Sequence, residues 1–110
     1  NAILSDNNMA IFIAEYEGRI IGLIQVMIQE AADLPYMMPR RFAKICDLVV
    51  AREFHRRGAG LALMAEADKW ARQHRAGSME LNVYEFNRGA QAFYKKQGYV
   101  TASRMMWKEL

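Results

Sequence analysis

The sequence contains few residues of the types that bind metals, take part in redox chemistry or interrupt helices and strands. Its 110 residues include one cysteine, two histidines and two prolines. The single cysteine, Cys46, excludes an internal disulfide, and neither His55 nor His74 has neighbours at the spacing that a zinc site requires. The sequence therefore predicts no metal and no redox chemistry.

Long apolar runs are missing as well. No stretch approaches the roughly 18 to 20 consecutive apolar residues that a membrane span needs, and the N-terminus lacks the pattern of a signal peptide. We therefore expect a cytoplasmic protein with no membrane partner. A composition of 53% apolar and 25% charged residues predicts one globular domain over residues 1–110. The start at Asn1, in place of Met, predicts a full protein that is longer at its N-terminus.

A large excess of one charge is also absent, since the formal net charge is only +3. The positive charge is nevertheless concentrated in the segment 40–57, which holds Arg40, Arg41, Lys44, Arg52, Arg56 and Arg57. A local cluster of this kind favours a small polyanion as ligand over a nucleic-acid duplex. Nucleic-acid binding through this segment is kept as an alternative, and it predicts a steep dependence of affinity on salt.

The first half of the chain is rich in β-branched and apolar residues. Residues 10–16 and 19–29 are separated by Glu17-Gly18, which predicts an antiparallel hairpin. Residues 30–42 carry both prolines and no regular period, so they are predicted to form a loop over the sheet edge. A third strand is predicted over residues 43–50.

A helical period begins after Gly58 and ends at Gly77, with a predicted apolar stripe of Leu61, Met64, Ala67, Ala71 and His74 beside Leu63 and Trp70. A strand is predicted over 78–83, and Asn87 is placed as the N-cap of a short helix that Gly98 closes. Residues 99–110 are predicted to add a last strand or a bent hairpin arm. The predicted class is α/β, with a mixed, mostly antiparallel sheet and the order β-β-β-α-β-α-β.

The most informative stretch is 46–63, where an apolar strand runs through a basic glycine loop into a helix. Gly58 and Gly60 let backbone N–H groups approach a ligand closely. The helix that follows adds its unpaired first-turn N–H groups and the positive end of its dipole. This arrangement predicts an anion site, and a phosphate-bearing cofactor is its natural ligand.

Two common phosphate sites do not fit this loop. No Gly-Lys-Ser/Thr follows the glycines, so a P-loop is excluded. A dinucleotide fingerprint fits less well than its glycines suggest, because Leu63 takes the position of the third glycine and Glu80 falls inside a predicted strand.

Three motifs in order make the chain resemble the GNAT acetyltransferase superfamily from about Ala10 onward. His-Arg-Arg-Gly-Ala-Gly at 55–60 is similar to the family's Gln/Arg-x-x-Gly-x-Gly/Ala. Asn-Arg-Gly-Ala-Gln-Ala-Phe-Tyr-Lys-Lys-Gln-Gly-Tyr at 87–99 is similar to Asn-x-x-Ala-x-x-Phe-Tyr-x-x-x-Gly-Phe. The segment 105–110 resembles a final strand that ends in Lys-x-Leu.

The resemblance implies a GNAT acyl-CoA N-acyltransferase fold with helices on both sheet faces, lacking here the N-terminal strand and helices. It implies acetyl-CoA as the acetyl donor, with no metal. The implied pyrophosphate contacts are Arg56, Arg57, Gly58, Ala59, Gly60 and Leu61. The implied pantetheine contacts are Leu48, Val49 and Val50, on a strand that splays from its neighbour, with Asn87, Ala90 and Phe93 near the cofactor.

The implied activity is acetyl transfer to a primary amine of a small molecule, a peptide or a protein. Tyr94 resembles the family's tyrosine acid, although a phenol beside Phe93 is also a common packing residue. The base stays open between Asp47, Glu80 acting through water, and water alone, because Cys46 stands where some relatives have a glutamate. Asp47 is carried as the catalytic candidate. A non-catalytic acyl-CoA binding or sensing module is the alternative, and a homodimer is a further possibility.

Overall fold

A five-stranded sheet with the order β1-β2-β3-β4-β5 forms the body of this computed structural model, which describes residues 2–5, 8–31 and 40–110. The strands are β1 (Ala2–Ser5), β2 (Met9–Tyr16), β3 (Arg19–Ala31), β4 (Arg40–Val50) and β5 (Ser78–Glu80). β1 to β4 pair antiparallel, whereas β5 runs parallel to β4. The predicted α/β class with a mixed, mostly antiparallel sheet is confirmed.

The predicted hairpin is present as β2 and β3. Glu17 and Gly18 both have positive φ, 49° and 78°, which is the conformation of a two-residue turn that matches the strand twist. β1 was not predicted. The predicted loop over 30–42 is wrong at both ends, because Glu30 pairs with Arg41 and Ala31 with Arg40. Its centre, 32–39, lies outside the described residues.

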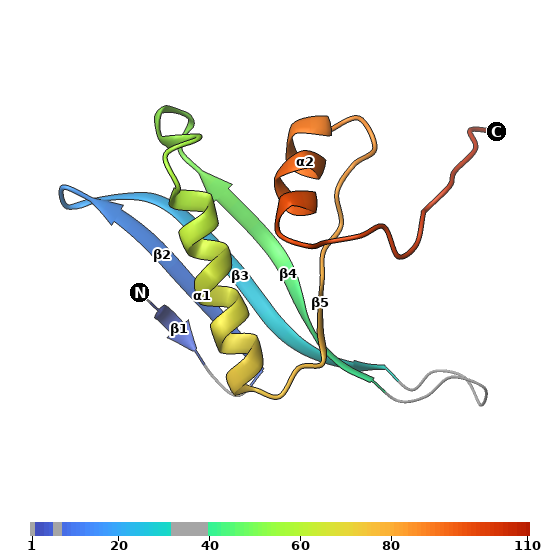
Figure 1. The fold of residues 1–110 in the computed structure, drawn as a ribbon, viewed down its shortest axis with the longest axis horizontal. Helices are drawn as coiled ribbons and strands as arrows, with labels where there is room; N and C mark the ends of the chain where they lie inside the picture. Colours follow the sequence, from blue (N-terminus) through green and yellow to red (C-terminus); the bar gives the residue numbers. More distant parts are fainter. Residues whose placement is uncertain (1, 6–7, 32–39) are drawn as a thin grey trace.

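Two α-helices and one short 3-10 turn complete the described elements: η1 (Arg52–Phe54), α1 (Ala59–Gln73) and α2 (Arg88–Lys96). α1 lies across the strands β2, β3 and β4, and α2 lies beyond β4 on the side of β5 (Figure 1). α1 buries Leu63, Met64, Ala67, Trp70 and Ala71. The predicted stripe is wrong at Leu61, which is 54% exposed at the start of the helix.

Close approach between α1 and the sheet depends on Gly22 in β3. A Cβ atom at this position would lie 2.9 Å from the carbonyl oxygen of Val49 and 3.2 Å from Cδ1 of Leu63. Leu63 is 3% exposed, so its side chain fills the space that Gly22 leaves open. Leu63, which stands at the third glycine position of the dinucleotide fingerprint, therefore packs onto Gly22 of β3.

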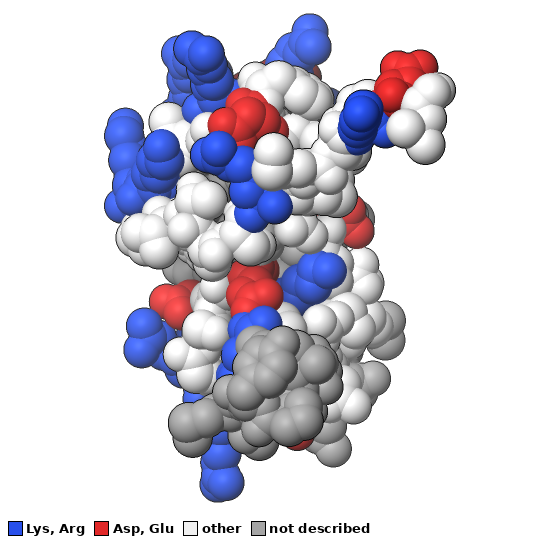
Figure 2. Space-filling view, turned by 90° about the vertical axis from the view of Figure 1, so that its right-hand side faces the viewer, with Lys and Arg blue, Asp and Glu red and all other residues white. Residues whose placement is uncertain are grey.

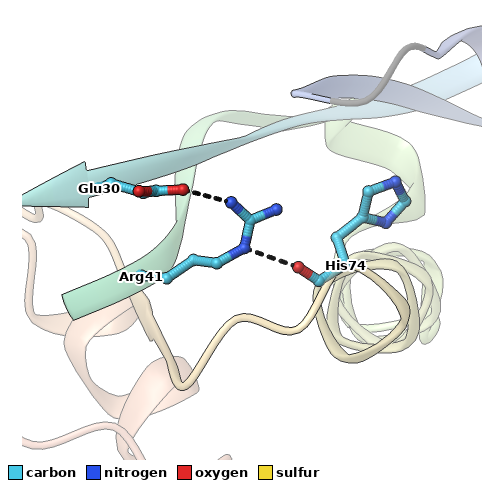
Figure 3. A network of polar contacts seen from close by, with 3 residues as sticks. All are labelled: Glu30, Arg41 and His74. Carbon is cyan, nitrogen blue, oxygen red and sulfur yellow. Dashed lines mark hydrogen bonds and ion pairs between the residues drawn. The ribbon is translucent and has the colours of Figure 1, made fainter.

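Arg41 joins the far end of α1 to the β3–β4 hairpin (Figure 3). Its Nε donates to the carbonyl oxygen of His74 at 2.8 Å, and its Nη1 donates to Oε1 of Glu30 at 2.7 Å. The carbonyl oxygen of Arg41 accepts from the Gly77 N–H at 2.8 Å. The last helical carbonyls thus receive a cation, which the helix dipole favours.

The C-terminal region departs most from the sequence prediction. β5 spans only Ser78–Glu80, half of the predicted 78–83. Residues 99–110 form no helix and no strand, so the predicted last strand is wrong. Within the described ranges, no helix is long and apolar enough to cross a membrane.

We predict that Gly22→Ala destabilises the fold by about 1–3 kcal/mol, because the added methyl must displace the β4 backbone or Leu63. Gly89→Ala is the matched control, since a Cβ there meets nothing within 4 Å and alanine suits a helix better than glycine. Urea unfolding of both variants measures the difference. Equal stabilities would show that Gly22 is not a close-packing position.

Candidate functional site

The candidate site begins at an open edge of β4. Pairing between β4 and β5 is limited to Phe42 with Ser78, Ala43 with Met79 and Lys44 with Glu80. β4 continues to Val50 alongside β3, so its second half has no strand partner on the β5 side within the described residues. The two parallel strands diverge there, as the resemblance implies.

A β-bulge at Cys46 sets which side chains of β4 face α1. Gln25 pairs with Asp47 and the next residue of β3, Val26, pairs with Ile45, which leaves Cys46 as the extra residue. After the bulge, Leu48 and Val50 pack against the core. Asp47 and Val49 are exposed, and Val49 is 57% accessible.

The carbonyl group of Val50 points away from β3, toward the gap that opens between β4 and β5. The Ala51 N–H donates to the carbonyl oxygen of Ile21 at 2.7 Å, and successive amides of a strand point to opposite sides. His55 uses this arrangement, since its Nε2 donates to the Val50 carbonyl oxygen at 2.8 Å. The His55 side chain therefore links the start of the glycine loop back to the end of β4.

The loop itself exposes backbone donors. Arg56 and Gly58 have left-handed φ values of 63° and 85°, and alternation of this kind turns neighbouring N–H groups to one side as in an anion-binding nest. Gly58 is the N-cap of α1 and supplies no side-chain cap, and no acidic residue lies in the first turn. The first-turn N–H groups of Ala59, Gly60 and Leu61 are thus left for an anion.

Gly60 is the point where three elements meet. A Cβ there would lie 3.5 Å from Cζ of Phe93 and 3.8 Å from Cγ2 of Val50. The start of α1, the end of β4 and the inner side of α2 are therefore in contact. Side-chain bulk at Gly60 would push against Phe93 and Val50, which lie under the loop.

Asn87 forms the predicted N-cap of α2. Its Oδ1 accepts from the Ala90 N–H at 3.1 Å, so the side-chain oxygen is already used. The main-chain N–H of Asn87 donates to the Tyr84 carbonyl oxygen at 3.0 Å, whereas the side-chain nitrogen Nδ2 of this exposed residue donates to no group in the described part of the chain. Only this nitrogen remains to contact a ligand.

Three aromatic rings form a cluster behind the divergence. Tyr94 packs edge-on against Phe93 and Tyr99, with ring centroids 5.3 and 5.8 Å apart. Burial raises the pKa of the Tyr94 phenol above its ordinary value, so the phenol keeps its proton at neutral pH. Burial, with the negative charge of Asp68 and the neighbouring Tyr94, raises the pKa of Tyr99 to about 12.

The structure separates the two carboxylates considered as the base, Asp47 and Glu80, and places Cys46 between β-strand pairs at the bulge. Glu80 forms an ion pair with Arg40 where β5 ends, whereas Asp47 lies exposed on β4 past the bulge. Desolvation, with a smaller contribution from Asp47, raises the pKa of the Cys46 thiol against the opposing effect of Lys44. A thiol held protonated is a poor nucleophile.

Sequence reasoning missed an aromatic anchor beneath the loop. Phe54 contacts Tyr16 of the hairpin with centroids 5.2 Å apart, and the Arg57 guanidinium lies over the Phe54 ring at 5.8 Å. Arg19 and Glu53 form an ion pair at 3.6 Å on the same side. These residues and Glu17 line a surface hollow of about 350 Å³. Phe54 is the one apolar side chain in the basic stretch 52–57, which is the signal that could have revealed it.

Basic side chains gather at the height of the loop and α2 in the view from the β5 side (Figure 2). The lysines and arginines of these two elements are Arg52, Arg56, Arg57, Arg88, Lys95 and Lys96. The field at this end of the molecule therefore favours an anionic ligand. In the ranges that the structure describes, no three His, Cys, Asp or Glu side chains are grouped to hold a metal ion.

An open strand edge, a glycine loop and an uncapped helix start follow one another along the chain, in the order that the family resemblance implies. The chain matches the acetyltransferase (GNAT) family over residues 1–99 and belongs to that family. The resemblance drawn from the three motifs is confirmed.

Curated relatives share part of their length with this chain. Streptothricin acetyltransferase A of Bacillus subtilis is 30% identical over 59 residues, covering 54% of this chain and 34% of that protein. The uncharacterized N-acetyltransferase MJ1207 of Methanocaldococcus jannaschii is 30% identical over 88 residues, covering 80% and 38%. The matched region thus spans about a third of each relative.

Solved structures support the fold. A mutant of the BH1408 protein from Bacillus halodurans aligns with a TM-score of 0.88 at 25% identity, over 94% of this chain and 66% of that one. The aminoglycoside N-acetyltransferase AAC(6')-Iy in complex with CoA aligns with a TM-score of 0.82 at 20% identity, over 96% and 78%.

We predict a loss of stability at alkaline pH that depends on Tyr99. Its pKa of about 12 in the folded protein exceeds the ordinary phenol value of about 10 in the unfolded chain. The contribution is thus complete below about pH 10 and is lost as the pH rises toward 12. Urea midpoints of wild type and Tyr99→Phe, measured from about pH 8 to about pH 11.5, should fall more steeply for wild type. Parallel curves would contradict the prediction.

Proposed function

We propose that residues 1–110 are an acetyl-CoA-dependent N-acetyltransferase domain that acetylates a primary amine of a small molecule, peptide or protein. The carrying observation is the open edge of β4 leading directly into an uncapped, glycine-bearing helix start. Membership of the GNAT family supports the donor, and the one cysteine and the composition support the cytoplasm as compartment.

Acetyl-CoA contacts the protein through two of its parts, the pantetheine arm between β4 and β5 and the pyrophosphate at the glycine loop. The amide-bearing pantetheine arm pairs with the backbone of Leu48 and Val50, whose N–H and C=O groups point away from β3, while Val49 between them pairs with Leu23 of β3. The pyrophosphate lies on the N–H groups of the loop and of the first turn of α1, from Arg56 to Leu61, and the Arg57 N–H is shared with the Phe54 carbonyl oxygen, to which it donates at 3.4 Å. Ala90 and Phe93 cover the arm from α2, and the free amide nitrogen of Asn87 donates to it.

His55 sets a limit on this pairing. Its imidazole already donates to the carbonyl oxygen of Val50, so that oxygen is shared with any added strand. The Val50 N–H and the backbone of Leu48 are the groups left for the arm. His55 in this proposal holds the loop, and its side chain makes no contact with phosphate.

Acetyl-CoA supplies the acetyl group as a thioester, and transfer forms a C–N bond while breaking a C–S bond. Tyr94 serves as the acid that protonates the departing sulfur, since a phenol holds its proton at neutral pH. Burial raises the pKa of Tyr94 above the ordinary phenol value of about 10, so proton transfer to the thiolate is uphill and depends on the two groups being held together.

The acceptor amine must lose a proton before or during attack. Asp47 is the proposed base, since it is a carboxylate on β4 one residue past the bulge and no ion pair of the described residues engages it. Glu80 is held by Arg40, so its use as a base would require that pair to open.

A non-catalytic acyl-CoA binding module is the second candidate, and the exposed position of Asp47 favours it. Thiol release from acetyl-CoA, assayed across a panel of small amines and lysine peptides, decides between the two. CoA binding in calorimetry without turnover on any amine would leave only the binding module. Turnover that follows acceptor concentration supports the enzyme.

We predict that Gly58→Val weakens CoA binding about tenfold or more. Its φ of 85° disfavours a β-branched residue by about 1–2 kcal/mol, so the loop relaxes and its N–H groups no longer converge. Gly98→Val is the matched control, since Gly98 has a φ of 96° and equally open surroundings. Calorimetric titration with CoA should show near wild-type affinity for Gly98→Val. Equal affinities in both variants would remove the loop from the site.

We predict that Tyr94→Phe lowers kcat by about 10²-fold with little change in the Kd for CoA, as expected for loss of a general acid. Tyr99→Phe is the control within the same ring cluster, and its kcat should stay near that of wild type. Steady-state kinetics with one acceptor measures both. Equal losses in the two variants would show that the cluster acts by packing.

A further inference from the structure

The hollow between the β2–β3 turn and the glycine loop lies outside the proposed acetyl-CoA site. The residues that line it are Tyr16, Glu17, Arg19, Glu53, Phe54 and Arg57. None of them belongs to β4, β5 or α2, and the β2–β3 turn and α2 lie on opposite sides of α1 (Figure 1). Its volume of about 350 Å³ is near the lower end of the range for small-molecule pockets. The hollow therefore has room for a small ligand separate from the cofactor.

Two aromatic rings form an apolar wall of this hollow. The Phe54 and Tyr16 rings meet at a tilt of 57° with centroids 5.2 Å apart, so each restrains the other. Tyr16 is 51% exposed, which leaves part of its surface uncovered by the protein. Rings that are held in place offer contact area to a ligand at little entropic cost. This wall therefore suits the apolar part of a ligand.

Arg57 directs positive charge into the hollow. Its guanidinium lies over the Phe54 ring, 5.8 Å from the centroid, so the side chain is turned toward the hollow although its main chain belongs to the glycine loop. Arg57 forms no ion pair with a described residue. A guanidinium without a carboxylate partner is suited to a carboxylate ligand, which it binds through two parallel hydrogen bonds.

Glu17 brings negative charge from the side of the turn. Its φ is 49°, a left-handed conformation that Asn, Asp or Gly adopts more readily than glutamate at this turn position. The turn itself therefore does not account for a glutamate here, and a residue held in this conformation beside a hollow points to a role for its side chain. No ion pair between described residues engages Glu17.

The other two charges of the hollow neutralise each other. Arg19 pairs with Glu53 at 3.6 Å and thereby links the hairpin to η1. With two arginines and two glutamates, the lining has no net charge, so its field favours neither a simple anion nor a simple cation. One unpaired positive group and one unpaired negative group remain in the same hollow. A ligand that carries both charges can meet both groups at once.

We propose that this hollow binds a small zwitterion with an apolar side group, namely a free aliphatic or aromatic α-amino acid. Its carboxylate pairs with the Arg57 guanidinium, and its ammonium group pairs with the Glu17 carboxylate. Its side group packs on the rings of Phe54 and Tyr16. This ligand is neither the donor nor the acceptor of the proposed transfer, so the site does not depend on that activity.

Ligand-observed NMR titrations on the whole chain, without acetyl-CoA, test the site. At least one of L-phenylalanine and L-leucine should bind with a Kd of about 1 mM or below. Its analogue without the ammonium group, phenylpropionate or isocaproate, and its analogue without the carboxylate, phenethylamine or isopentylamine, should bind about tenfold more weakly, because each leaves one charge of the hollow unpaired. Absence of binding for both amino acids up to about 10 mM, or equal binding of the analogues, overturns the proposal.

Substitutions separate binding in the hollow from adsorption elsewhere on the surface. Glu17→Gln removes the charge at nearly constant size and should weaken amino-acid binding about tenfold. Glu15→Gln is the matched control, since Glu15 is also exposed near the turn but does not line the hollow, and its affinity should stay near that of wild type. Saturating CoA should change the wild-type affinity less than about threefold. Equal affinities in the two variants, or displacement of the amino acid by CoA, overturns the proposal.

Discussion

One extra residue in β4 determines the geometry on which the candidate site depends. The bulge at Cys46 reverses the alternation of the strand, so Leu48 and Val50 pack toward the core where Ala43 and Ile45 do before it. Without it, Asp47 and Val49 would face the helix, and a carboxylate would be buried without a partner at a cost of several kcal/mol. The bulge follows directly on the last β4–β5 pair, Lys44 with Glu80. Because a bulge bends and twists its strand, it explains why the two parallel strands separate there.

After the bulge has reversed the alternation of β4, close packing at two glycines positions the glycine loop that precedes α1. Gly22 brings β3, the end of β4 and Leu63 of α1 into contact, and Gly60 does the same for α1, Val50 and Phe93 of α2. A Cβ at Gly22 would press on the Val49 backbone at 2.9 Å, whereas a Cβ at Gly60 would make ordinary van der Waals contact with Phe93 at 3.5 Å. The start of α1 is therefore fixed against β4 without a side-chain cap, and its N–H groups stay available. The contact between the Phe54 and Tyr16 rings holds the other side of the loop, so the candidate site lies between the β2–β3 hairpin and α2.

Much of this could be predicted from the sequence because the signals are local. Glu17-Gly18 predicts its turn from residue type alone, and Asn87 predicts its cap from the residues that follow it. The bulge could not be predicted, since it exists only in the register between Cys46 and a strand some twenty residues earlier. The last strand was predicted from apolar residues at 99–110. Residue type shows only that this segment can pair, and a strand also needs a partner edge, with which residues 99–110 do not pair in the described part of the chain.

The same distinction separates the donor side of the site from the acceptor side. The proposed donor side is one continuous stretch from the bulge to the first turn of α1, so local motifs are enough to propose it. No motif marks an acceptor side. The chain after β5 holds two exposed rings, Tyr84 and Phe86, which stack with centroids 5.3 Å apart. Aromatic rings held in this way offer contact area at little entropic cost, as in other recognition surfaces.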